Sequence, residues 1–172
     1  VLAENGGVSR AYLIKARVLE AAGNKEEAIT VLTEAAAKFP DDNPLLFRLA
    51  YFLERNGQWQ RSVQIFKEMH TRKPDDPAIM NYLGYTLADH DSELEFALEL
   101  ISKAVEVEPE NAAYLDSLGW VFFKLGRYIE AEEQLDQALK LSPEEEEILA
   151  HNIEVKIALQ KYQEALTILE KG

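Results

Sequence analysis

Residues 112–143, AAYLDSLGWVFFKLGRYIEAEEQLDQALKLSP, predict two helices joined by a short turn at 125–127. Small and apolar side chains recur in this stretch at steps of three and four residues, as on one face of a helix: Leu118, Gly119, Phe122, Ala131, Leu135 and Ala138. Pro143 closes the pattern. We expect Gly119 and Ala131 to mark the closest approach of the two helices, because a larger side chain there would push them apart.

The same pattern recurs along the chain. Closing prolines stand at positions 40, 74, 109 and 143, and counting from them gives repeats at 9–42, 43–76, 77–111, 112–145 and 146–172. Residues 1–8 then form the end of a preceding helix, stopped at Asn5, Gly6 and Gly7. A single helix pair cannot bury its own apolar face, so we expect residues 1–172 to form one stacked array.

A helix–turn–helix unit of this length, with these small and aromatic residues, resembles the tetratricopeptide repeat. The resemblance covers essentially the whole chain. It implies an all-α fold, a right-handed superhelical solenoid of antiparallel helix pairs. It also implies that the first helix of each pair lines a concave, protein-binding groove.

The third and fourth repeats are more specific than the general pattern. NYLGYTLAD at 81–89 and AYLDSLGW at 113–120 are similar to bacterial members of the family. Those members include cell-envelope lipoproteins that act as adaptors for proteins such as periplasmic proteases. This similarity favours the periplasmic side of a bacterial envelope as the location, with the cytoplasm as the alternative.

Composition excludes several classes of partner. The net charge of −13 argues against nucleic acid and anionic membranes, which both attract basic patches. No stretch approaches the roughly 18 apolar residues of a membrane helix, so we expect no direct insertion. The chain has no cysteine, which removes disulfides and thiol chemistry. Because it begins at Val1, we expect it to be part of a longer protein.

Local signals predict where individual helices begin. Asn43, Asp76 and Ser142 each precede a proline, and each is interpreted as the N-cap of a helix. Ser92 and Glu95 form a capping box in the third repeat, where Asp89, His90 and Asp91 replace the usual glycine turn. Glu132 is expected to face outward from the fourth repeat.

The fifth repeat fits the pattern less well. Asn152, Ile153 and Lys156 stand where the family has leucine, glycine and tyrosine, and Ile153 is too large for a close contact between helices. A shift by one residue would place Glu154 at that contact. The register of this repeat therefore stays open between the two alternatives.

Catalytic and metal sites are not expected. The histidines at 70, 90 and 151 lie in different repeats, and none stands near a nucleophile at a recognisable spacing. The consecutive residues Asp89, His90 and Asp91 seldom converge on one ion, and the turn explains them. We therefore predict a protein with no enzymatic activity, no metal and no cofactor.

The family resemblance assigns the groove to residues that packing does not require. These are Arg17, Phe47, Tyr51, Arg55, Asn81, Tyr85, Asp116, Trp120, Phe123 and Lys124. Tyr51, Tyr85 and Trp120 occupy the same position in successive repeats, and such aromatic stripes suit peptide recognition. The alternative is that these rings pack against one another. The Lys/Asn/Arg clamp that some members use for chaperone carboxylates is absent.

The sequence therefore predicts a protein-interaction adaptor that holds a partner segment in this groove. Two alternatives remain open, a structural or self-assembly module and a regulatory domain of a larger protein. The identity of the partner and the oligomeric state are not determined.

Overall fold

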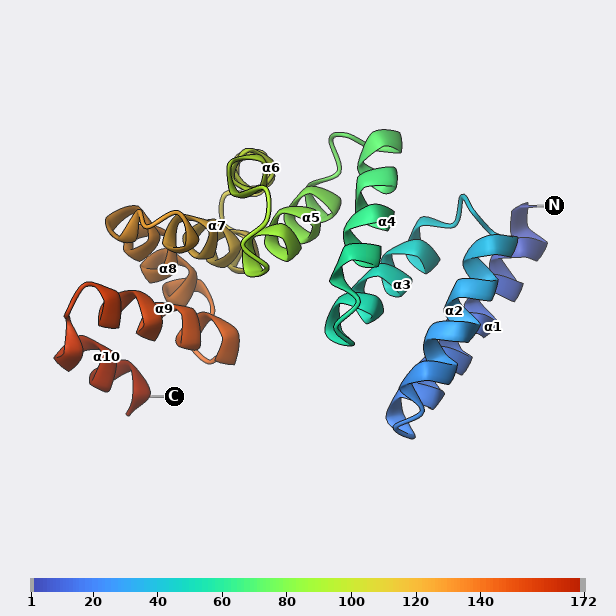
Figure 1. Ribbon diagram of the computed structural model, residues 1–172, viewed down its shortest axis with the longest axis horizontal. Coiled ribbons are helices and arrows are strands. Elements are labelled where there is room, and N and C mark those ends of the chain that lie inside the picture. The colour runs from blue at the N-terminus through green and yellow to red at the C-terminus, as the bar shows by residue number, and fades with distance from the viewer. Residues whose placement is uncertain (1, 171–172) are drawn as a thin grey trace. The chain divides into compact units, whose positions relative to one another are not determined.

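The computed structural model describes the backbone of residues 2–170 and the side chains of residues 7–170 (Figure 1). This part of the chain is all-α. Its helices are α1 (Leu2–Ala21), α2 (Lys25–Lys38), α3 (Asn43–Arg55), α4 (Trp59–Arg72), α5 (Pro77–Asp89), α6 (Leu94–Val107), α7 (Ala112–Lys124), α8 (Tyr128–Leu141), α9 (Glu146–Ala158) and α10 (Tyr162–Leu169).

The chain divides into two compact units, Val1–Pro74 with α1–α4 and Asp75–Gly172 with α5–α10. Within each unit, successive helices pack as pairs, and the first helices of neighbouring pairs also touch. The repeat starts predicted at 43, 77, 112 and 146 are the first residues of α3, α5, α7 and α9. The predicted pairs are therefore confirmed within the units. That both units belong to one array stays a prediction.

The predicted break before Ser9 is absent, because α1 runs without interruption from Leu2 to Ala21. Glycine costs about 1 kcal/mol in a helix interior relative to alanine. That cost disfavours a helix without forbidding one, so Asn5, Gly6 and Gly7 do not end it. The interpretation of 1–8 as a separate helix end was wrong.

Two of the three proline-based caps are also wrong. Asp76 caps α5 as predicted, and its carboxylate accepts from the Ile79 amide. For α3 the cap is Asp42, whose carboxylate accepts from the Leu45 amide at 3.0 Å, because the proline stands second in the helix rather than first. Ser142 instead follows the last turn of α8, and α9 begins four residues later, at Glu146.

The turn of the third repeat replaces glycine with strained residues. In the first, second and fourth repeats a glycine of the turn has positive φ, as at Gly126 with φ +75°. Between α5 and α6, Asp91 (φ 50°) and Glu93 (φ 45°) take left-handed conformations instead. Glu93 occupies the N-cap position without a capping side-chain hydrogen bond, so the capping box predicted at Ser92 is not formed.

Helix pairing in the second unit depends on two close contacts. A Cβ atom added at Gly119 would lie 2.5 Å from Leu135 Cγ and 3.1 Å from the Ala131 carbonyl oxygen. A Cβ at Gly84 would lie 2.6 Å from Ile101 Cγ1. These distances are shorter than van der Waals contact, so α7 and α5 can approach α8 and α6 this closely only at glycine. The predicted contact at Gly119 and Ala131 is confirmed.

The fifth repeat keeps the register counted from the prolines. The residues that depart from the family pattern are accommodated there by polar contacts. Asn152 and Lys156 are buried on α9, where apolar residues were expected. Asn152 Nδ2 donates to Asp136 Oδ1 at 3.1 Å, and Lys156 Nζ lies 2.7 Å from Glu132 Oε1 and 3.0 Å from Asp136 Oδ1. Charge pairing to α8 thus replaces the usual apolar packing.

Glu132 is therefore not the outward-facing residue that the sequence suggested. Its side chain is 14% exposed, and it accepts from both Lys156 and Lys161. Burial raises the pKa of Glu132, but the hydrogen bonds from the two lysines outweigh it and leave the pKa below its ordinary value. The ionised carboxylate thus stabilises the fold above the ordinary pKa of glutamate, and this contribution is lost as pH falls through the lowered value.

We expect Gly119→Ala to lower the free energy of unfolding by about 1–3 kcal/mol, because the new methyl group overpacks the contact with Leu135. The matched control is Gly7→Ala on α1, where a Cβ meets nothing within 4 Å. That change should raise the stability by up to about 1 kcal/mol through helix propensity. Denaturant unfolding followed by circular dichroism measures both, and effects of the same sign would contradict the assigned contact.

Glu132→Gln is expected to cost about 1–3 kcal/mol at neutral pH, because the buried Lys156 ammonium loses one carboxylate partner and keeps Asp136. Glu133→Gln, at the exposed neighbouring position, should change stability by less than about 0.5 kcal/mol. The difference between the wild type and Glu132→Gln should shrink as pH falls below the ordinary pKa of glutamate. A difference independent of pH in urea titrations would show that Glu132 is not ionised in the folded state.

Candidate protein-binding face

The first helices of the second unit bring their side chains together on one side. Helix α7 lies next to both α5 and α9. We call this surface the first-helix face. It consists of Asn81, Tyr85 and Asp89 on α5, Asp116, Trp120, Phe123 and Lys124 on α7, and Glu147 and His151 on α9. Seven of these nine residues belong to the groove list or to the turn that the sequence singled out, whereas the positions of Glu147 and His151 emerge from the structure.

Trp120 is the centre of the first-helix face. Its ring stacks on His151, with centroids 4.1 Å apart and planes at 15°, and on Phe123, at 5.0 Å and 10°. The indole N–H donates to Asp89 Oδ1 at 3.2 Å. Trp120 thus contacts side chains of α5, α7 and α9 and keeps part of its surface exposed. The alternative of ring packing therefore holds for Trp120, and its role in binding a partner stays a prediction.

A buried pair of polar groups lies beside this stack. Asp116 is 4% exposed and His151 is 8% exposed, and His151 Nδ1 lies 3.0 Å and 3.1 Å from the two carboxylate oxygens of Asp116. Burial raises the pKa of Asp116 above its usual value, and the contact with His151 opposes that rise. The pair joins α7 to α9 and sets the orientation of the imidazole ring that covers Trp120.

Tyr85 connects α5 to α9. Its hydroxyl donates to Glu147 Oε1, across a separation of 62 residues in sequence. Burial raises the pKa of Tyr85 far above its ordinary value, and the hydrogen bond to Glu147 raises it further. The hydroxyl therefore stays protonated and remains a donor at any physiological pH. The ring of Tyr85 also lies 6.3 Å from that of His151.

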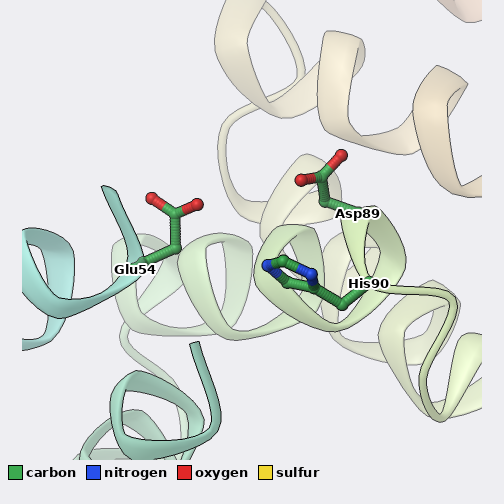
Figure 2. Close-up of side chains that lie close together, drawn as sticks. All are labelled: Glu54, Asp89 and His90. Carbon is green, nitrogen blue, oxygen red and sulfur yellow. The ribbon is translucent and has the colours of Figure 1, made fainter. Parts of the chain in front are cut away.

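The turn after α5 supplies polar anchors to this face. Figure 2 shows Asp89 and His90 side by side at the end of α5, and also draws Glu54, which belongs to α3 in the first unit. Asp89 accepts from Trp120, and Lys124 Nζ reaches the Asp89 carbonyl at 3.2 Å and the Asp91 carboxylate at 3.1 Å. These contacts give Asp89 and Asp91 structural roles in the second unit. The absence of a metal here stays a prediction.

In the first unit, two arginines flank Tyr51, and one of them is the predicted Arg55. The Tyr51 hydroxyl accepts from Arg55 at 2.9 Å, and the guanidinium carbons of Arg48 and Arg55 lie 5.8 Å and 5.7 Å from its ring centroid. Arg17 is exposed on α1. Phe47 instead packs edge-on against buried Phe66 of α4, with centroids 5.3 Å apart, so much of its ring is taken up by the core.

Two predicted groove residues offer little surface to a partner. Asn81 is 5% exposed and Asp116 is 4% exposed. Tyr85, Trp120, Phe123 and Lys124 are half-buried. The family pattern did not point to His151, because it does not count that repeat position among the groove positions. The one available signal was its spacing, since His151 lies one turn after Glu147 on the same side of the helix.

Comparisons with known proteins agree with this architecture. The model of the tetratricopeptide repeat matches residues 9–52, and that of anaphase-promoting complex, cyclosome, subunit 3 matches residues 90–172. A TPR repeat-containing protein of Pseudomonas aeruginosa is 34% identical over 140 residues, which cover 81% of this chain. This chain belongs to the tetratricopeptide repeat family. It spans about a quarter, 24%, of the length of that relative.

Solved structures of tetratricopeptide repeat proteins share the fold. A thermophilic TPR protein of Thermus thermophilus is 26% identical to this chain, with a TM-score of 0.80. The matched region spans 95% of this chain and 89% of the Thermus protein. MamA of Desulfovibrio magneticus is 21% identical, covers 95% and 92%, and has a TM-score of 0.75. Among residues 2–170 of this tetratricopeptide repeat chain, no helix is both long and apolar enough to cross a membrane.

The hydrogen bond between Tyr85 and Glu147 can be measured by a double-mutant cycle. Tyr85→Phe combined with Glu147→Ala, which removes the acceptor, should show a coupling of about 1 kcal/mol in unfolding free energy, the usual net value of one hydrogen bond. Tyr85→Phe with Glu154→Ala is the matched pair and should be additive within about 0.5 kcal/mol. Additivity of the first pair would show that α5 and α9 do not meet on this face.

Proposed function

We propose that the chain is a non-catalytic adaptor that holds a segment of a partner protein on the first helices of its repeats. The tetratricopeptide repeat fold is typical of protein-interaction scaffolds. The observation that carries the proposal is the convergence of side chains from α5, α7 and α9 around Trp120. In the first unit, Tyr51 with Arg17 and Arg55 is the corresponding surface.

The physical reason is the combination of rigidity and exposure. Stacking on Phe123 and His151 and the hydrogen bond to Asp89 fix the rotamer of Trp120 before any partner arrives. A partner that covers the remaining surface of the ring therefore loses little side-chain entropy. Large aromatic rings held in this way are the usual dominant contacts of protein interfaces. Asn81 and Asp116 are buried and do not themselves form the contact surface, and Asp116 acts by orienting His151.

Trp120→Ala should weaken binding by about 2 kcal/mol or more, the loss typical of a central aromatic anchor. The partner is first purified from native extract on the immobilised chain, and its affinity is then measured by calorimetry. Tyr162→Ala is the matched control, because Tyr162 is an aromatic residue that is 57% exposed on α10. It should leave the affinity unchanged.

Unfolding curves separate binding from stability. Leu118 is buried in α7, and Leu118→Ala should cost about 2–5 kcal/mol of stability. Trp120→Ala should cost less, because part of the ring is already exposed to water. If Trp120→Ala leaves the affinity intact, or destabilises the fold as much as Leu118→Ala, then Trp120 belongs to the core and the proposal fails.

A further inference from the structure

Charge is distributed very unequally along the chain. Residues 75–172 contain 22 acidic and seven basic side chains, whereas residues 1–74 contain nine acidic and 11 basic. Most bases of the second unit are already paired: Lys103 with Glu99, Lys124 with Asp91, Arg127 with Glu130, and Lys156 and Lys161 with Glu132. The excess negative charge therefore belongs to exposed carboxylates and is not neutralised within the unit.

Part of this charge borders the first-helix face. Along α9, the residues Glu147, Ala150, Glu154 and Ile157 follow one another at steps of three and four and are all exposed. Such spacing puts them on one side of the helix. Glu147 begins this row and bonds to Tyr85, so the row starts at the first-helix face. We call these four residues the α9 row.

The α9 row combines two carboxylates with the apolar side chains of Ala150 and Ile157. Ile157 is 46% exposed, and Ala150 is too small to cover the backbone around it. The two carboxylates lie two helical turns apart, which is about 10 Å along the axis. Lys124, the one lysine or arginine of the first-helix face, is held by Asp91 and by the Asp89 carbonyl, and His151 is paired with Asp116. Neither is therefore available to neutralise Glu147 and Glu154.

We propose that the α9 row, together with Trp120, binds a basic amphipathic segment of the partner protein. This inference rests on the proposed function and specifies the chemistry of its partner. Arginine or lysine side chains about two helical turns apart pair with Glu147 and Glu154, and the apolar side of the segment covers Ile157 and the exposed part of Trp120. Complementary charge of this kind sets specificity and accelerates association.

The test uses synthetic probes of defined charge. The first is a fluorescein-labelled peptide in which arginine and leucine recur at helical spacing, and its twins carry glutamine or glutamate in place of each arginine. Binding to the full chain is measured by fluorescence anisotropy. The arginine peptide should bind about tenfold or more tightly than the glutamine twin, the glutamate twin should not bind, and added salt should weaken the arginine complex.

Paired variants locate the site. The double variant Glu147→Gln with Glu154→Gln should lower the affinity for the arginine peptide by about tenfold or more. Glutamine keeps an acceptor for the Tyr85 hydroxyl, and unfolding curves verify that the fold is retained. The control is Glu106→Gln with Glu133→Gln, which changes the net charge equally at exposed positions on α6 and α8. The control pair should weaken binding by less than about twofold.

The outcomes separate this inference from the proposed function. Equal losses in both pairs would mean that the peptide senses only the overall charge, which overturns the inference. The glutamine twin could instead bind the wild-type chain as well as the arginine peptide does, and bind the Trp120→Ala variant more weakly. That result would support the proposed function and overturn the inference of a basic partner. If neither Trp120→Ala nor the Glu147 and Glu154 variant changes the affinity for the arginine peptide, both the proposed function and this inference are overturned at this face.

Discussion

The close approach of paired helices at glycine is the constraint on which the rest of the second unit depends. Gly119 against Leu135, and Gly84 against Ile101, allow α7 and α5 to pack directly against side chains of α8 and α6, where no Cβ would fit. That contact fixes the rotation of α5 and α7 about their axes, and so decides which residues point away from the pair. Tyr85 and Trp120 each follow one of these glycines directly in the chain. A rotation that relieved the contact would also carry these rings away from the first-helix face.

The residues of the first-helix face that hold neighbouring repeats together are the ones that we propose for recognition. Its rings are held by neighbours from other repeats, since Glu147 accepts from Tyr85, and His151, oriented by Asp116, stacks on Trp120. Burying a carboxylate such as Asp116 is unfavourable unless a partner satisfies it. His151 satisfies the Asp116 carboxylate, so the pair fixes the orientation of the imidazole ring without leaving a buried charge unpaired. The resulting surface is rigid, part aromatic and acidic at its α9 border, which suits a partner segment of opposite charge.

The sequence predicted the elements that depend on local periodicity and failed where neighbours decide. Four predicted repeat starts coincide with the first residues of helices, because small and apolar residues at fixed spacing favour one helix periodicity. The break at Gly6 and Gly7 was wrong, because glycine weakens a helix without ending it. The cap at Ser142 was wrong, because its proline lies in the loop. Lys156 did not fit the expected pattern of the fifth repeat. Its partners Glu132 and Asp136 lie on α8, in the preceding repeat, and local spacing does not reveal them.

By itself, the sequence determined an all-α chain of tetratricopeptide repeats, the pairing of its helices and the side of each first helix that faces away from the pair. These follow from period and residue size, which are properties of neighbouring positions. Only the tertiary structure decided that Asn81 and Asp116 are buried, that His151 covers Trp120 and that Tyr85 reaches Glu147. Those contacts join residues of different repeats. They depend on how successive pairs stack, a geometry that no local spacing encodes.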